Sequence, residues 1–173
     1  MRQITEFKDV HTHNPQAGDD AVINLPWGAD VPAEGYFSVG IHPWDAAGAD
    51  ESDFSRLLDL ARCERVVAIG ETGLDALRGP GLAEQERVFL RHVQVSEQLG
   101  KPMIIHAVRT LHHILRLRKQ LQPRQRWIIH GFRGKPALAL QLIEAGIDIS
   151  LGKIYNPATM AAIPPEHLFR DTD

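Results

Sequence analysis

The sequence lacks the features that mark secreted, membrane or disulfide-bonded proteins. It has a single cysteine, Cys63, so an internal disulfide is excluded and a reducing compartment is favoured. No apolar run approaches the length of a membrane span. The first residues, from Met1 to Glu6, contain no apolar signal region. Together these absences predict a cytoplasmic protein with no membrane partner.

Acidic residues are missing from one long stretch of an otherwise weakly acidic chain. The formal net charge is −3, so no global basic field points to a nucleic-acid partner. No Asp or Glu lies between Glu97 and Glu144, whereas this stretch carries the basic residues Lys101, Arg109, Arg116, Arg118, Lys119, Arg124, Arg126, Arg133 and Lys135. Both a solvated helix face and a one-sided footprint for a polyanion fit this pattern.

Strand-like and helix-like segments alternate along most of the chain. Strands are expected over residues 7–13, 21–25, 36–41, 66–69, 102–105, 127–129, 147–151 and 167–173. Helices are expected over residues 50–64, 82–99, 108–121, 136–145 and 156–163. This alternation favours a parallel sheet. Eight strands favour an α/β fold, a compact (β/α)8 TIM-type barrel that lacks helices after strands 1, 2 and 8.

Histidines and carboxylates follow the predicted strands. The apolar run from Val66 to Ile69 leads into Glu71, and Gly70 and Gly73 are expected to turn the backbone on either side of it. The other groups at strand ends are His11, His13, His42, His106, His130 and Asp173. Because the carboxyl ends of barrel strands share one rim, these side chains are expected to converge.

Imidazoles and carboxylates packed together without a cation would leave charges and lone pairs uncompensated. The pattern therefore predicts a divalent metal site. Zn, Mn, Fe and Ni all suit such ligands, and the order of affinity does not distinguish them. Three further histidines, His92, His112 and His113, lie in predicted helices and are expected to be surface or packing residues. The position of His167 leaves both roles open.

These motifs, in this order, resemble the TatD-type metal-dependent deoxyribonucleases, a branch of the amidohydrolase-like barrels. The matching segments are Asp9-Val10-His11-Thr12-His13, Gly40-Ile41-His42-Pro43, Gly70-Glu71-Thr72-Gly73-Leu74-Asp75, Ile105-His106, His130-Gly131-Phe132-Arg133-Gly134 and Asp171-Thr172-Asp173. Asp171 stands where the family often has Glu, and the chain is similar to the family's short members. The whole chain, residues 1–173, is interpreted as one metal-dependent hydrolase barrel, truncated after its last strand.

The resemblance implies two divalent metal ions, with Zn, Mn or Mg as candidates. His11 and His13 would hold the first ion, and His106 and His130 the second. Glu71 would bridge the two ions, while Asp173 would complete the first site and act as base on a water activated by both. The implied catalytic residues are therefore Asp173 and Glu71.

The expected reaction is hydrolysis of phosphodiester bonds, with DNA as the expected substrate and partner. His42, Arg109, Arg133 and Lys153 are candidates for substrate binding. Two alternatives stay open. One is a hydrolase of small-molecule esters, amides or phosphoesters from the same barrel superfamily. The other is an inactive metal-binding homologue, since Asp173 would be a frayed terminal residue.

Strands without covering helices predict an exposed apolar surface. Strands 1, 2 and 8 are neighbours in a closed barrel, so their uncovered faces would form one patch. Phe7, Val22, Ile23 and Phe169 are its candidate members. We therefore expect either a homo-oligomer formed through this face or further residues of the natural chain. Loops from Asn14 to Gly35 that fold over the gap would remove the argument for a partner.

Overall fold

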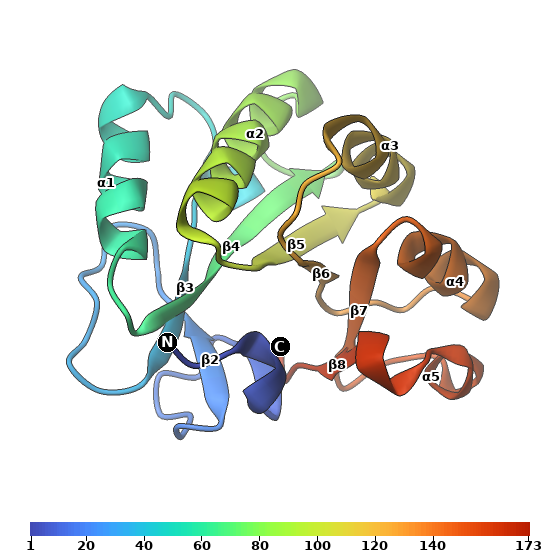
Figure 1. Cartoon of the computed structure of the whole chain (residues 1–173). Helices are drawn as coiled ribbons and strands as arrows, with labels where there is room; N and C mark the ends of the chain where they lie inside the picture. Colours follow the sequence, from blue (N-terminus) through green and yellow to red (C-terminus); the bar gives the residue numbers. More distant parts are fainter.

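The computed structural model describes residues 1–173 as eight parallel strands in sequential order around a barrel (Figure 1). The strands are β1 (Asp9–Thr12), β2 (Ala21–Asn24), β3 (Tyr36–Val39), β4 (Val66–Asp75), β5 (Met103–Val108), β6 (Trp127–Ile129), β7 (Ile147–Leu151) and β8 (Leu168–Arg170). Beyond β8, the amide of Thr172 donates to the carbonyl oxygen of His11 at 3.2 Å. This bond links the two edges of the sheet, and the predicted TIM-type barrel is confirmed.

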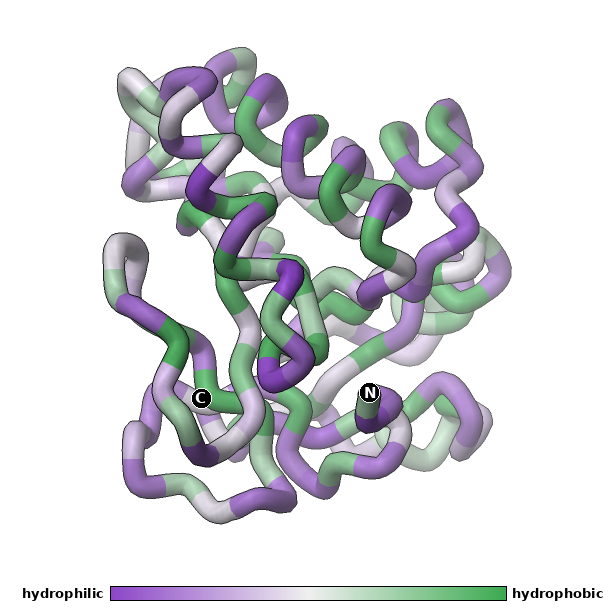
Figure 2. Tube along the Cα trace, turned by 60° about the vertical axis from the view of Figure 1, so that its left-hand side comes forward, coloured by the Kyte–Doolittle hydropathy of each residue, from purple (hydrophilic) through white to green (hydrophobic).

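Five helices follow the third to seventh strands, as predicted. They are α1 (Glu51–Ala61), α2 (Leu82–Leu99), α3 (Leu111–Leu121), α4 (Pro136–Glu144) and α5 (Pro157–Ala162). Short 3-10 turns lie at Ile4–Glu6 (η1), Pro43–Asp45 (η2) and Pro165–His167 (η3). Hydrophilic and hydrophobic residues alternate within the turns of the helices (Figure 2). No helix has both the length and the apolarity needed to cross a membrane.

Local signals explain most helix boundaries. Asp50 caps α1 by accepting hydrogen bonds from the amides of Ser52 and Asp53. Gly100 ends α2 with a φ of 68°, a left-handed conformation that suits glycine. The predicted start of α3 at Val108 is wrong, because β5 continues to that residue and Arg109 then turns the chain with a φ of 53°.

Strand β4 is longer than predicted, and its glycines have a different role. Glu71 lies within the strand rather than in a turn after it. A Cβ atom on Gly70 would lie 2.4 Å from the carbonyl oxygen of Ile104, and one on Gly73 would lie 1.9 Å from that of His106. Both glycines therefore let β4 approach β5 closely while the strand continues to Asp75.

The expected exposed patch is absent, and this prediction is wrong. Phe7, Val22, Ile23 and Phe169 are all buried. Three of them pack with Ile4 of η1 in a cluster inside the barrel, made of Ile4, Phe7, Val10, Val22, Val67, Ala68, Ile104, Ile128 and Phe169. Ile23 belongs to the larger core, against which Ala17, Trp27 and Val31 of the following loops also pack. The loops thus cover the gap, and the argument for a second copy on this face disappears.

Candidate metal centre

The carboxylate of Glu71 lies at the centre of five imidazoles. The residue is 3% exposed and comes from the middle of β4. Its oxygen Oε2 lies 3.4 Å from His11 Nε2 and 3.3 Å from His13 Nε2. Its oxygen Oε1 lies 2.8 Å from both His106 Nδ1 and His130 Nε2, and 3.3 Å from His42 Nε2. The structure therefore brings together the histidines predicted at four different strand ends.

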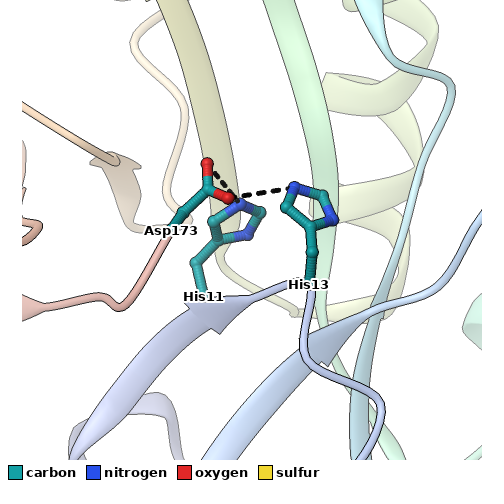
Figure 3. A group of neighbouring side chains, drawn as sticks. All are labelled: His11, His13 and Asp173. Carbon is teal, nitrogen blue, oxygen red and sulfur yellow. Dashed lines mark ion pairs between the residues drawn. The ribbon is translucent and has the colours of Figure 1, made fainter.

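Asp173 joins this cluster from the other edge of the barrel. Its carboxylate oxygens lie 3.5 Å from His13 Nε2, and 3.8 Å from His11 Nε2 and from His130 Nδ1. Figure 3 shows its carboxylate directed toward the rings of His11 and His13. The predicted ligand residues thus surround one small volume at the carboxyl ends of the strands.

The donor atoms of this cluster fit divalent cations. His11 is fully buried, yet neither of its ring nitrogens has a hydrogen-bond partner, and Nδ1 of His130 also lacks one. Unpaired buried nitrogens are costly unless something satisfies them. Three groups have ligand atoms within 4.8 Å of one another: His11, His13 and Asp173; His11, Glu71 and His130; and His42, Glu71 and His106. Imidazole and carboxylate donors are those that transition-metal ions prefer.

A second carboxylate, Asp75, orients His106 from behind. Oδ2 of Asp75 lies 3.0 Å from Nε2 of His106 and also accepts a hydrogen bond of 2.7 Å from the indole of Trp44. Desolvation opposes ionisation of Asp75, but these donors outweigh it and hold its pKa at about 2. An ionised carboxylate only accepts, so Nε2 of His106 must donate. Nδ1 is then the nitrogen directed at Glu71, and a cation between them would replace its proton.

Burial and hydrogen bonding shift the pKa values of Glu71 and the histidines in opposite directions. Desolvation favours neutral Glu71, but hydrogen bonds from the histidines outweigh it and hold the pKa of Glu71 far below its usual range. Desolvation lowers the pKa of His11, whereas the hydrogen bond with Glu71 raises the pKa of His13. An ionised carboxylate beside a neutral, buried imidazole is the state that coordinates cations.

The flanking motif residues hold the two edges of the site together. Thr172 donates its hydroxyl proton to Oδ2 of Asp9 at 2.5 Å, and Oδ1 of Asp9 accepts from the amide of His11 at 3.1 Å. Oδ2 of Asp171 accepts from the amide of Gly131 at 2.9 Å and from the hydroxyl of Ser150 at 2.6 Å. Although its side chain is shorter than the Glu that the family often has at this position, Asp171 connects the last motif to β7 and to Gly131.

A cavity of about 1220 Å³ opens over the cluster. Two of the four candidate substrate-binding residues, His42 and Arg133, line it together with His13, Glu71, His106, His130 and Asp173. Arg109 and Lys153 are exposed but do not line the cavity. Its wall also includes Asn24, Trp27, Trp44 and Phe132. Asn24 donates to the carbonyl oxygen of Gly70 at 2.8 Å and so holds the backbone before Glu71.

The acid-free stretch is largely neutralised by residues from elsewhere. Arg116 pairs with Glu86, Arg124 with Glu97, and Arg126 with Asp148. Lys101 is buried, with its ammonium donating to the carbonyl oxygens of Ala61, Cys63 and Val66. Among the exposed basic residues of the stretch, Arg109, Lys119, Arg133 and Lys135 have no ion-pair partner. The electrostatic footprint is therefore much smaller than the sequence suggests.

The remaining histidines have structural surroundings. His92 is fully buried in α2, where its Nε2 accepts from the amide of Ile41 at 2.8 Å. His113 contacts Glu86 on the outside of the barrel, and His167 contacts Asp148 near the start of β8. Asp75 and Trp44 were not among the predicted site residues. The only sequence signal for Asp75 is its place as the second carboxylate of the motif that begins with Glu71.

Comparisons with known proteins point to one family. The family described as "TatD related DNase" matches residues 20–173. The zebrafish (Danio rerio) protein tatdn3 is 28% identical over 98% of this chain and 74% of its own. The "3'-5' ssDNA/RNA exonuclease TatD" of Edwardsiella piscicida is 32% identical over 79% of this chain and 56% of its own.

Two further comparisons involve a second bacterial relative and a solved structure. The "uncharacterized metal-dependent hydrolase TatD" of Mycobacterium tuberculosis is 29% identical over 80% of this chain and 57% of its own. This chain thus spans little more than half the length of two of the three relatives named here. The crystal structure of the TatD homologue YJJV of Escherichia coli K12 superposes with a TM-score of 0.80 at 22% identity, over 99% of this chain and 80% of that one. At this identity the likeness concerns the fold.

Proposed function

The chain belongs to the TatD related DNase family of metal-dependent hydrolases, and from this premise we propose that it cleaves phosphodiester bonds in DNA or RNA strands. The observation that carries the proposal is the convergence of five imidazoles on one buried carboxylate beneath an open cavity. A relative named as an exonuclease of single-stranded DNA and RNA supports the choice of substrate.

We propose that this centre holds two divalent ions, Zn, Mn or Mg. His11, His13 and Asp173 would hold one, and His106 and His130 the other, with Glu71 between them. The support is that Oε2 of Glu71 faces His11 and His13, whereas Oε1 faces His106 and His130. When bound, such cations supply a Lewis acid that activates water near neutral pH and offsets charge on a phosphodiester.

The side chains around the cavity would divide the remaining tasks. The carboxylate of Asp173 is 36% exposed, so it can take a proton from the attacking water at an oxygen that faces the cavity. Arg133 lines the cavity without an ion-pair partner, which leaves its guanidinium free for a phosphate oxygen. His42 lies 3.3 Å from Glu71, where it can donate to substrate or serve as a ligand.

The test is metal content and cleavage in one matched set of proteins. The purified protein and its Glu71→Gln variant are analysed for bound metal, then assayed on an end-labelled single-stranded oligonucleotide with Mg, Mn or Zn added. We expect Glu71→Gln to lose both metal and cleavage, because one carboxylate serves all five imidazoles. Glu144→Gln makes the same change at an exposed site without an ion pair and should behave as the parent.

Two results would contradict the proposal. One is a parent-like metal content in Glu71→Gln, because a ligand shared by both ions cannot be dispensable. The other is a metal-loaded parent that cleaves no oligonucleotide but hydrolyses a small ester or amide. The cytoplasmic location expected from the single cysteine stays a prediction, which fractionation of cells expressing the natural protein would test.

A further inference from the structure

An exposed tryptophan stands at the rim of the metal centre in a fixed position. The side chain of Trp44 lines the cavity, and the residue is 43% exposed. Its indole nitrogen donates to Asp75 at 2.7 Å, and its ring lies edge-on to His42 with the ring centroids 4.6 Å apart. An aromatic ring that lines a cavity and is fixed by a hydrogen bond offers a preorganised surface for a planar ligand.

The loop beside Trp44, which connects β4 to α2, is fixed by hydrogen bonds. The buried side chain of Gln85 donates to the carbonyl oxygens of Asp75, Arg78 and Pro80, which span the connection from β4 to α2. A Cβ atom on Gly79 would lie 2.8 Å from the carbonyl oxygen of Pro43, so this loop packs directly against the turn that carries Trp44. The two segments therefore form one rigid rim.

This rim places a cation over one face of the aromatic ring. The guanidinium of Arg78 lies over the Trp44 ring, 4.6 Å from its centroid, and no carboxylate pairs with it, so a planar ligand would stack on the opposite face. Its neighbour Leu77 is 60% exposed. A planar aromatic group with an unneutralised cation and exposed apolar surface is the combination that binds unpaired bases together with their phosphates.

We propose that Trp44 is the stacking platform for an unpaired nucleobase of the substrate, and that Arg78 holds the phosphate beside that base. This inference rests on the proposed function and extends it, because it assigns base recognition to residues outside the metal centre. A base within a duplex has no free face to offer Trp44, so the rim selects single-stranded ends. The stack would also be sequence-tolerant, since every base has a π-face.

The test compares binding of two oligonucleotides that differ only in their bases. Equilibrium binding is measured by fluorescence anisotropy for a thymidine hexamer and for an abasic hexamer with the same phosphates. Trp44→Phe and Trp44→Leu both remove the indole bond to Asp75, but only phenylalanine keeps an aromatic face. We expect Trp44→Leu to weaken thymidine binding about tenfold, to the level of the abasic hexamer, while Trp44→Phe stays near the parent.

The second variant, Arg78→Met, removes the charge and keeps the apolar stem. It should weaken both hexamers alike and lower the salt dependence of binding by the contribution of about one phosphate contact. Equal affinity of the parent for the two hexamers, parent-like thymidine binding in Trp44→Leu, or binding of neither hexamer would overturn the inference. Cleavage of both hexamers by the parent without base dependence would overturn it while leaving the proposed function intact. Base-dependent binding without cleavage would instead leave this inference standing and remove the proposed function.

Discussion

Asp75 offers the sharpest test of how the metal centre is organised. Its carboxylate accepts four hydrogen bonds: Oδ1 accepts from the amides of Leu77 at 2.8 Å and Arg78 at 3.1 Å, and Oδ2 from Trp44 and His106. Asp75→Asn keeps the shape but replaces one acceptor oxygen with an NH2 group. Two of the four donors must then face a donor.

The structure indicates which donors will adapt. The amides of Leu77 and Arg78 cannot move without disrupting the loop that Gln85 holds. His106 can adapt, because its imidazole can carry the proton on Nδ1 and accept at Nε2. The amide of Asn at position 75 would therefore turn its NH2 group toward His106. Nδ1 of His106 would then present a proton to Glu71, and that nitrogen could no longer serve as a ligand.

The expected effect follows from the bonds that change. Loss of a carboxylate behind a histidine ligand costs about 10- to 100-fold in metal affinity. The indole of Trp44 also loses its acceptor, so the unfolding free energy of the metal-free protein should fall by about 1–3 kcal/mol. Calorimetric titration with Mn²⁺ or Zn²⁺ measures the affinity. ¹⁵N NMR of the metal-free protein shows whether Nε2 of His106 carries a proton, as expected in the parent, or has lost it, as expected in Asp75→Asn.

Two controls separate the causes. Asp45→Asn removes the same charge beside the same cavity, at an exposed residue whose carboxylate forms no hydrogen bond or ion pair with a histidine side chain, and should bind metal like the parent. Trp44→Phe removes only the indole bond and should leave the proton of His106 on Nε2. Metal affinity within twofold of the parent in Asp75→Asn would refute the reasoning, and so would an unchanged protonation site on His106.

Three further predictions concern the whole molecule. Removing metal with a chelator should lower the melting temperature, because the ions bind only the folded state. Adding metal back should raise the melting temperature again, with the logarithm of the metal concentration. A melting temperature that chelation does not change would argue against a metal site in the folded protein. If a nucleic-acid strand is bound, Arg133→Gln should lower the slope of log affinity against log salt by the contribution of about one phosphate contact. Arg109→Gln should lower this slope less, because Arg109 lies outside the cavity. Equal slopes in the parent and both variants would count against a phosphate contact by Arg133. Burial lowers the pKa of His92 to about 4, so the unfolded chain binds more protons than the folded protein between pH 6.5 and 4. The free energy of unfolding should therefore fall by about 3 kcal/mol as the pH falls through that window. His92→Gln should lose this part of the pH dependence in urea titrations, and an unchanged profile would show that His92 is not its source.

The sequence alone determined the order of the elements and most of the candidate metal ligands. Apolar runs and helical periodicity are local properties, so the eight strands and the exact span of α2 could be predicted from neighbouring residues. The strand-end rule then placed His11, His106 and His130 on one rim before any contact was known. The carboxyl ends of parallel strands meet whatever the details of packing.

Only the tertiary structure decided how those elements meet. Gly70 and Gly73 predict a turn by their conformational freedom, but the close approach of β5 uses that freedom to keep β4 continuous. The burial of Phe7 and Phe169 depends on η1 and on loops whose positions no periodicity specifies.

The charges and the support of His106 were decided in the same way. Acidic residues distant in the sequence neutralise much of the basic stretch, and Asp75 reaches His106 and Trp44 across strands. Such pairings depend on distances between side chains that are far apart along the chain. A linear sequence specifies which partners exist, and only the packed barrel specifies which of them touch.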